Sequence, residues 1–132
     1  MQKQRLLKLA QHLETGKLIH KKFDYRVLNT LGIDKYGNTI DTFDTKGCGT
    51  LGCALGECPG VFKGWRFNNQ RVPVYNTCDS ATLSAKLFFG LSPNEVDYLF
   101  FPGEDSNPLP DSSTRKRVAR HIRDFVKRRE LK

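Results

Sequence analysis

The sequence has no apolar run of the length that a membrane-spanning helix requires, which is about 20 residues. Its first residues lead directly into an amphipathic segment, without the apolar stretch and small-residue cleavage site of a secretion signal. Internal repeats, low-complexity tracts and linkers are also missing. We therefore expect a cytoplasmic protein without a membrane-embedded part, folded as a single compact domain over residues 1–132.

Motifs that carry enzyme chemistry are absent as well. The chain has no Cys-x-x-Cys pair and no phosphate-binding loop with its lysine. Its candidate bases are His12, His20 and His121, and nothing in the sequence places one beside a nucleophile. A chain of this length buries roughly two-thirds of its unfolded surface, so it needs no metal or disulfide to fold. We predict that the protein is not an enzyme and uses no cofactor and no metal.

Negative charge is scarce at both ends of the chain. The formal net charge is +8, with +5 in residues 1–22, +7 in residues 115–132 and −4 between them. Chain ends often lie close together, in which case the two segments form one basic face. Such a face attracts phosphate polymers, anionic ligands or acidic proteins. The alternative is a solvated charge that only keeps the protein soluble.

Apolar residues at helical spacing predict an amphipathic helix near each end of the chain. They are Leu6, Leu9, Ala10 and Leu13 in residues 2–14, and Val118, Ile122, Phe125 and Val126 in the last helix. Gly16 is a typical stop for the first helix. We expect Ser112 or Ser113 to begin the last one, after a loop over residues 103–111.

Two further helices are expected in the second half of the chain. Asp79 or Ser80 can cap a helix over residues 81–89, with Leu83, Leu87 and Phe88 facing inward. Ser92, Pro93 and Glu95 form a capping box with proline at the first helical position. The apolar face of that second helix is Val96, Leu99 and Phe100, and Pro102-Gly103 ends it.

Short strands are expected around two turns. Residues 65–67 and 71–75 flank residues 68–70, and Pro73 would confine its strand to an edge. Residues 25–28 and 39–43 could pair around residues 36–38. The predicted fold is mainly α, with four to five short helices and one or two small β-hairpins, and the alternative is α+β.

Residues 48–60 are rich in cysteine and glycine, and we expect a helix over residues 50–58, capped by Thr50 and ended by Pro59-Gly60. Gly52 and Gly56 would share one face of it. Because each glycine costs a helix about 1 kcal/mol relative to alanine, that face indicates close packing against another element or a ligand. The candidate ligand or packing motif is Cys48, Gly49, Thr50, Gly52, Cys53 and Gly56.

Burial of small residues is the favoured interpretation of this segment, and four alternatives stay open. A metal site would use Cys48, Cys53, Cys58 and Cys78, with His20 or His121, although helical geometry turns Cys53 and Cys58 apart. A disulfide is disfavoured in a cytoplasmic protein. Cys48 just before a helix would have a stabilised thiolate. Residues 47–50 could hold an anion at the helix N-terminus, although no lysine follows.

The order of these motifs resembles a group of small proteins from phages and their bacterial hosts. The shared pattern is Cys48-Gly49-Thr50-x-x-Cys53-Ala54-Leu55-Gly56, then Pro59 and Phe62, then Phe88-Phe89-Gly90-Leu91 and Leu99-Phe100-Phe101-Pro102. It covers roughly residues 48–126. Relatives often have a tryptophan–alanine pair at Cys58-Pro59. The group has no established activity, so the resemblance implies a phage or mobile-element origin and a host-cell cytoplasmic location.

We therefore predict a non-enzymatic binding protein, monomeric or homodimeric, that engages a host protein or an anionic ligand, for instance in counter-defence. The candidate contacts are Arg115, Lys116, Arg120, Arg123, Lys127 and Arg128, with Lys3, Arg5 and Lys8. The alternative is a nucleic-acid-binding regulator that contacts phosphates through the last helix. Residues 80–101 could be read as a helix-turn-helix, but Glu95 and Asp97 make its second helix unsuited to face phosphates.

Overall fold

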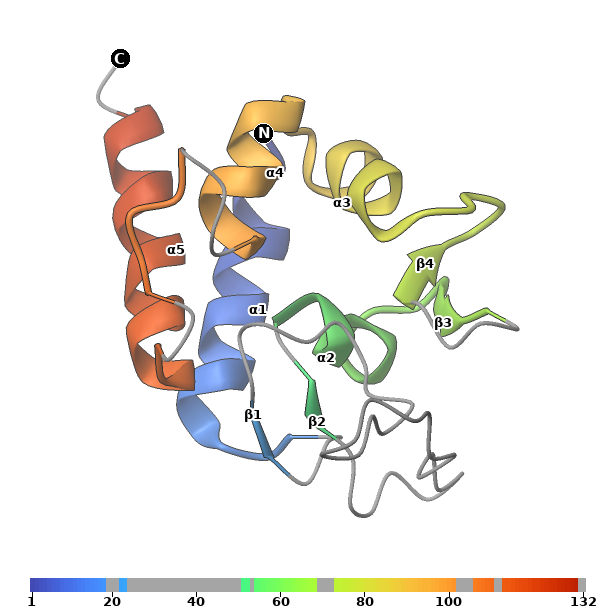
Figure 1. Cartoon of the computed structure of the whole chain (residues 1–132), viewed down its shortest axis with the longest axis horizontal. Coiled ribbons are helices and arrows are strands. Elements are labelled where there is room, and N and C mark those ends of the chain that lie inside the picture. Colours follow the sequence, from blue (N-terminus) through green and yellow to red (C-terminus); the bar gives the residue numbers. More distant parts are fainter. Residues whose placement is uncertain are drawn as a thin grey trace, which may run out of the picture.

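The computed structural model describes residues 1–18, 22–23, 51–52, 54–68, 73–101, 106–110 and 113–130. Within these ranges the chain forms five helices and two small two-stranded sheets (Figure 1). The helices are α1 (Lys3–Thr15), α2 (Ala54–Val61), α3 (Ala81–Phe89), α4 (Pro93–Phe100) and α5 (Arg115–Glu130). The strands are β1 (Lys22–Phe23), β2 (Leu51–Gly52), β3 (Trp65–Phe67) and β4 (Pro73–Tyr75). The predicted fold class, mainly α with a small hairpin, is confirmed.

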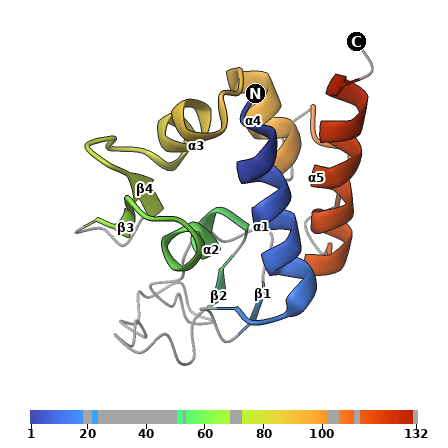
Figure 2. The ribbon, with the colours of Figure 1, turned by 180° about the vertical axis from the view of Figure 1, so that it is seen from behind.

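The first and last helices lie side by side along one flank of the molecule (Figures 1 and 2). Each buries the apolar stripe expected for it, and α5 additionally buries Ala119 and His121. Gly16 ends α1 in the left-handed conformation, at a φ of +75°. α5 begins later than expected, because Thr114 and not Ser112 or Ser113 accepts the amide of Arg117, at 3.2 Å. The Ser113 hydroxyl instead donates to the carbonyl of Pro110.

Helices α3 and α4 follow their predicted boundaries. Ser80 accepts the Leu83 amide at 3.0 Å, and Ser92 and Glu95 form the complete capping box. The inward face predicted for α3 is wrong at two positions, since Leu83 is 38% and Leu87 58% exposed. The helix instead buries Ala81, Ser84, Ala85, Phe88 and Phe89, and the hydroxyl of Ser84 accepts the backbone amide of Tyr75 at 2.8 Å.

Helix α2 starts at Ala54, which corrects the expected range of 50–58. Gly52 belongs to β2, so Gly52 and Gly56 do not share a helical face. Pro59 lies inside α2 rather than ending it, and the helix continues to Val61. The proposed cap Thr50 lies outside the described residues, four positions before the helix. Gly56 and Cys58 are both buried in this helix.

The predicted hairpin near residue 70 is present. β3 and β4 pair antiparallel, with Arg66 opposite Val74, and Pro73 lies in a two-stranded sheet where every strand is an edge. β1 and β2 pair in parallel and join segments far apart in sequence. The hairpin expected over residues 25–43 lies outside the described residues.

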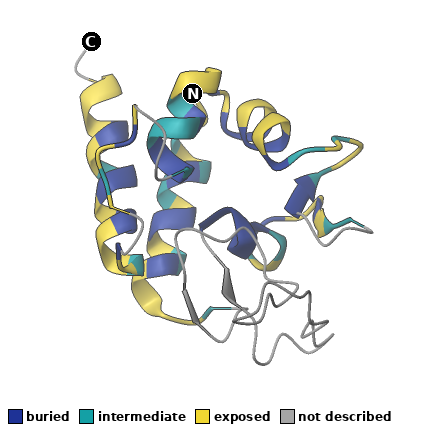
Figure 3. Cartoon of the chain, viewed as in Figure 1, coloured by how far each residue is buried: buried dark blue, intermediate teal, exposed yellow. Residues whose placement is uncertain are grey.

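One apolar cluster joins all five helices (Figure 3). Its aromatic part gathers around Phe88 and Phe89, whose rings contact one another with centroids 5.0 Å apart. Phe62, Trp65 and Phe100 pack against these two rings. The helices therefore surround a shared core, and the surfaces of α1, α4 and α5 that face away from it carry the candidate sites.

Candidate functional site

The packing of α1 against α5 brings the two basic ends of the chain together, but the protein itself engages several of the predicted anion-binding cations. Arg115 donates to the carbonyls of Leu13 and Glu14, at 2.6 and 3.0 Å. Arg123 binds the Glu14 carboxylate through two nitrogens, at 2.8 and 2.6 Å. That pairing lowers the pKa of Glu14 and raises that of Arg123. Lys3 forms an ion pair with Glu130. These residues join α1 to α5.

The remaining predicted cations of α1 face the aromatic core. Arg5 donates to the carbonyl of Phe88 at 2.7 Å, and its guanidinium carbon lies 4.2 Å from the centre of the Phe88 ring. Lys8 lies over the Phe62 ring, with its nitrogen 5.6 Å from the ring centre. Arg5 is therefore better explained as a structural contact than as a ligand contact, and Lys8 keeps an exposed ammonium group.

Three exposed cations remain in a row on the outer face of α5. Lys116, Arg120 and Lys127 lie within about 40° of one another around the helix and span about 16 Å along its axis. None of them has an ion-pair partner among the described residues. Toward α4 the row is flanked by exposed Arg117 and Arg128, with Asp124 between these two. We call the three residues the α5 row.

A hollow of about 410 Å³ lies between α4 and α5, beside the α5 row. It is lined by Glu95, Tyr98, Phe125, Arg128 and Arg129. Arg128 donates to the Tyr98 hydroxyl, and its guanidinium carbon lies 5.7 Å from the centre of that ring. Arg129 pairs with Glu95 at 3.3 Å. The hollow therefore combines two aromatic rings with two guanidinium groups and one carboxylate.

His121 contacts Tyr98, one of the residues that line this hollow. Its Nε2 lies 2.8 Å from the carbonyl oxygen of Tyr98, and its ring centre is 4.5 Å from that of Tyr98. Burial lowers the pKa of His121, and the bond to the Tyr98 carbonyl partly opposes that shift. A neutral imidazole that donates to a carbonyl holds α4 on α5, so His121 is explained as a structural residue.

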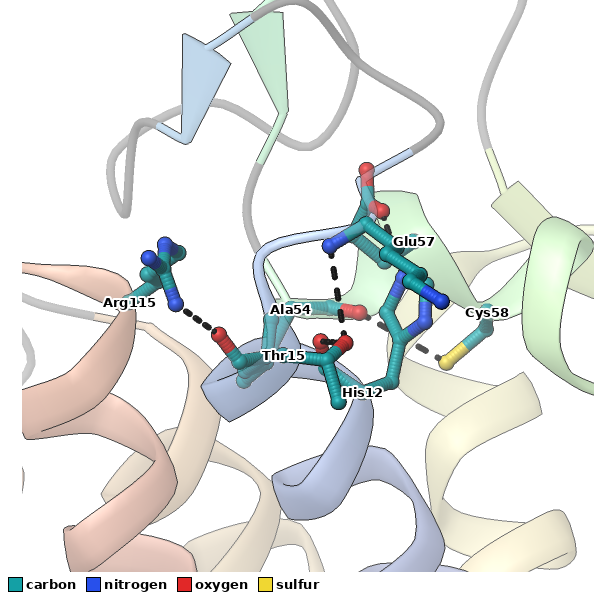
Figure 4. A network of polar contacts seen from close by, with 8 residues as sticks. His12, Thr15, Ala54, Glu57, Cys58 and Arg115 are labelled. Carbon is teal, nitrogen blue, oxygen red and sulfur yellow. Dashed lines mark hydrogen bonds and ion pairs between the residues drawn. The ribbon is translucent and has the colours of Figure 1, made fainter.

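A buried carboxylate lies at the junction of α1 and α2 (Figure 4). Glu57 is fully buried, and its Oε1 lies 2.8 Å from Nε2 of His12, whose side chain is 16% exposed. His12 also borders a shallow hollow of about 280 Å³, together with Thr15 and Gly60. The lysines Lys8 and Lys17 line the same hollow. Because burying a carboxylate is costly without a partner, this pair constrains how the two helices meet.

Of the predicted cysteine set, the structure describes Cys58 and Cys78. Cys58 is buried and its thiol donates to the Ala54 carbonyl at 3.7 Å, while Cys78 is a free, half-buried thiol. Among the described residues, no three His, Cys, Asp or Glu side chains gather closely enough to hold a metal ion. Cys48 and Cys53 lie outside them, as do Gly49, Thr50 and His20. Because α2 begins at residue 54, Cys48 does not directly precede that helix in the sequence.

Comparisons with known proteins add no identity. No family model, no curated protein and no solved structure matches the chain. In the parts of the chain that are described, no helix combines the length and apolar character needed to cross a bilayer.

Sequence reasoning did not find the residues of the α4–α5 hollow other than Arg128. The sequence predicts Glu95 as part of the capping box and Phe125 as part of the core stripe of α5, and it singles out neither Tyr98 nor Arg129. The position of the half-buried Tyr98 beside the basic side of α5 follows only from the packing of two helices. The His12–Glu57 pair was equally hidden, since 45 residues separate its members.

Proposed function

We propose that the protein is a non-enzymatic binding protein that engages an anionic macromolecule through the α5 row. The observation that supports this most directly is the exposure of Lys116, Arg120 and Lys127 on one line of α5, without ion-pair partners among the described residues. Cations that are already paired gain little from a ligand, whereas these three keep their full charge for one.

The linear arrangement favours a polymer of charges over a single small anion. A small anion would be held by donors that converge on one point, but these three side chains are spread along the helix over about 16 Å. A polyanion that contacts all three releases its own counterions, so its affinity should fall with salt. For three phosphate contacts the slope of log affinity against log salt is about −2 to −3.

The two histidines that the structure describes, His12 and His121, support the non-enzymatic part of the proposal. His12 and His121 each hold a structural partner through Nε2, namely the Glu57 carboxylate and the Tyr98 carbonyl. With the phage-like resemblance, this favours an accessory protein in a host-cell cytoplasm whose partner is an acidic protein surface or a nucleic acid.

The test is a charge reversal with a matched control. The variant K116E/R120E/K127E reverses the α5 row, and K17E/K63E/K86E makes the same change in net charge at exposed positions elsewhere. Fluorescence anisotropy with labelled polyphosphate, an oligonucleotide and a polyglutamate peptide measures binding at several salt concentrations. We expect the row variant to lose at least about tenfold in affinity and the control less than about threefold. Equal losses in the two variants, or no binding of any probe, would refute the proposal.

A further inference from the structure

We propose that the hollow between α4 and α5 accepts an unpaired base of a single-stranded nucleic acid, while the phosphates of that strand follow the α5 row. This inference rests on the proposed function, because the same helix supplies both surfaces. The hollow and the row lie on neighbouring faces of α5, because Arg128, which lines the hollow, is about 100° around the helix from Lys127 of the row.

The lining of the hollow has the two kinds of group that a base requires. The half-buried ring of Tyr98 provides flat apolar surface, Phe125 lines the hollow with only 7% of its surface exposed, and Arg128 can stack its guanidinium plane on a base. Arg129 and Glu95 provide donors and an acceptor at hydrogen-bonding distance from each other, at 3.3 Å. The volume of about 410 Å³ lies in the range of roughly 300–1,000 Å³ that is usual for ligand sites.

Tyr98 is held in place before any ligand binds. One contact is its ring against His121, with centroids 4.5 Å apart, and another is Phe125 at 5.9 Å. Its hydroxyl is bonded to Arg128. A fixed ring loses little conformational freedom when a base stacks on it or on the adjoining guanidinium, which favours binding.

The same features argue against other anionic partners. In a duplex the faces of the bases are already stacked and cannot enter a hollow between helices. An acidic protein surface would use the cations but has no need of an aromatic recess beside them. A positively charged surface combined with an aromatic platform is the usual arrangement in proteins that bind single strands without sequence preference.

The inference is tested with probes that carry equal charge and differ in their bases. The probes are a labelled 12-nucleotide single strand of mixed sequence, an abasic strand of the same length, a hairpin duplex and polyphosphate. We expect the base-bearing strand to bind about 5- to 150-fold more tightly than the abasic one, the range that one stacked base contributes. We also expect it to bind more tightly than the duplex.

The matched variants are Tyr98→Leu and Tyr98→Phe. The leucine variant removes the ring but keeps the backbone carbonyl that accepts from His121, and the phenylalanine variant keeps the ring and removes only the hydroxyl. We expect Y98L to bind the base-bearing and abasic strands equally, and Y98F to keep most of the preference. Thermal unfolding of both variants shows whether they fold.

A second measurement uses the unaltered protein. Photocrosslinking to a strand with 5-iodouracil, followed by peptide mass spectrometry, should locate the adduct at Tyr98 or Phe125. Equal binding of base-bearing and abasic strands, equal binding of the duplex, or an adduct confined to other regions would each overturn the inference and leave the proposed function standing. Failure of every probe, polyphosphate included, would instead remove the proposed function.

Discussion

Replacing His12 by alanine should lower the free energy of unfolding strongly, although the His12 side chain is partly exposed to solvent. The replacement takes a partner from the Glu57 carboxylate, which is fully buried. Taking the hydrogen-bond partner from a buried acceptor costs about 1–3 kcal/mol, and more when the acceptor is charged. Because the His12 side chain is 16% exposed, water can enter the space left by the ring. We therefore expect a loss of about 2–4 kcal/mol in the free energy of unfolding.

Urea unfolding followed by circular dichroism at pH 7 measures this loss. Gln11→Ala is the matched control, because Gln11 is the exposed neighbour in the same helix and should change stability by less than about 0.5 kcal/mol. Glu57→Gln keeps the shape of the side chain and removes its charge. In the double variant H12A/E57Q the cost should be smaller than the sum of the two single costs, because the charge that needs a partner is gone. If H12A lowers the free energy of unfolding no more than Q11A does, or if the losses of H12A and E57Q add in the double variant, the His12–Glu57 pair does not stabilise the protein.

Three further predictions concern stability. Burial depresses the pKa of His121 below its ordinary value of 6.5, so the unfolded chain takes up the proton first as pH falls. The free energy of unfolding should therefore be at its full value above about pH 6.5 and decline as pH falls through the folded pKa, and urea unfolding between pH 7 and 5 should show a smaller decline in H121Q. Ser92→Ala removes the side-chain acceptor of a capping box and should cost about 1 kcal/mol, measured by chemical denaturation, whereas an unchanged midpoint would show that α4 does not depend on its cap. Gly90→Ala should cost about 1–2 kcal/mol, because Gly90 has a φ of +66° and a Cβ there would lie 3.3 Å from the backbone of Met1; a calorimetric melting temperature equal to that of the parent would contradict this.

The helices that could be predicted from sequence are those with both a regular apolar stripe and a clear end signal. α1 has four leucine and alanine positions at helical spacing and Gly16 after them, and α4 has its capping box. Both signals are local, because they depend on residues within one or two turns of each other. α2 has no regular apolar stripe, and it continues past Pro59, a residue that usually ends a helix. Its boundaries therefore depended on tertiary packing.

The inward face of α3 shows how packing overrides hydrophobicity. Leucines at 83 and 87 were expected in the core, but α3 lies so close to the hairpin that Ser84 reaches the backbone of Tyr75. The buried side of α3 also carries Phe88, whose ring centre lies 4.7 Å from that of Tyr75, and Leu83 and Leu87 lie on the opposite, outward side. No property of residues 81–89 alone signals the presence of that hairpin.

Only part of the candidate site could be predicted from the sequence, for a similar reason. The basic character of the last helix is a matter of composition, so the cations of the α5 row could be named from sequence. Which cations the protein itself engages could not, because Arg115 and Arg123 find their partners 101 to 109 residues earlier in the chain. The hollow beside the row likewise forms only where α4 meets α5.

The pairing of α1 with α5 has a consequence for the way in which the chain is made. Leu13 and Arg115 are 102 residues apart, and closing a loop of that length costs roughly 4 kcal/mol of chain entropy. On the ribosome, at about 5–20 residues per second, α1 waits roughly 5–20 s before α5 has been synthesised. Throughout that interval α1 lacks the helix that is its main packing partner. The nascent chain therefore presents part of the apolar face of α1 to chaperones and to other nascent chains until its last helix emerges.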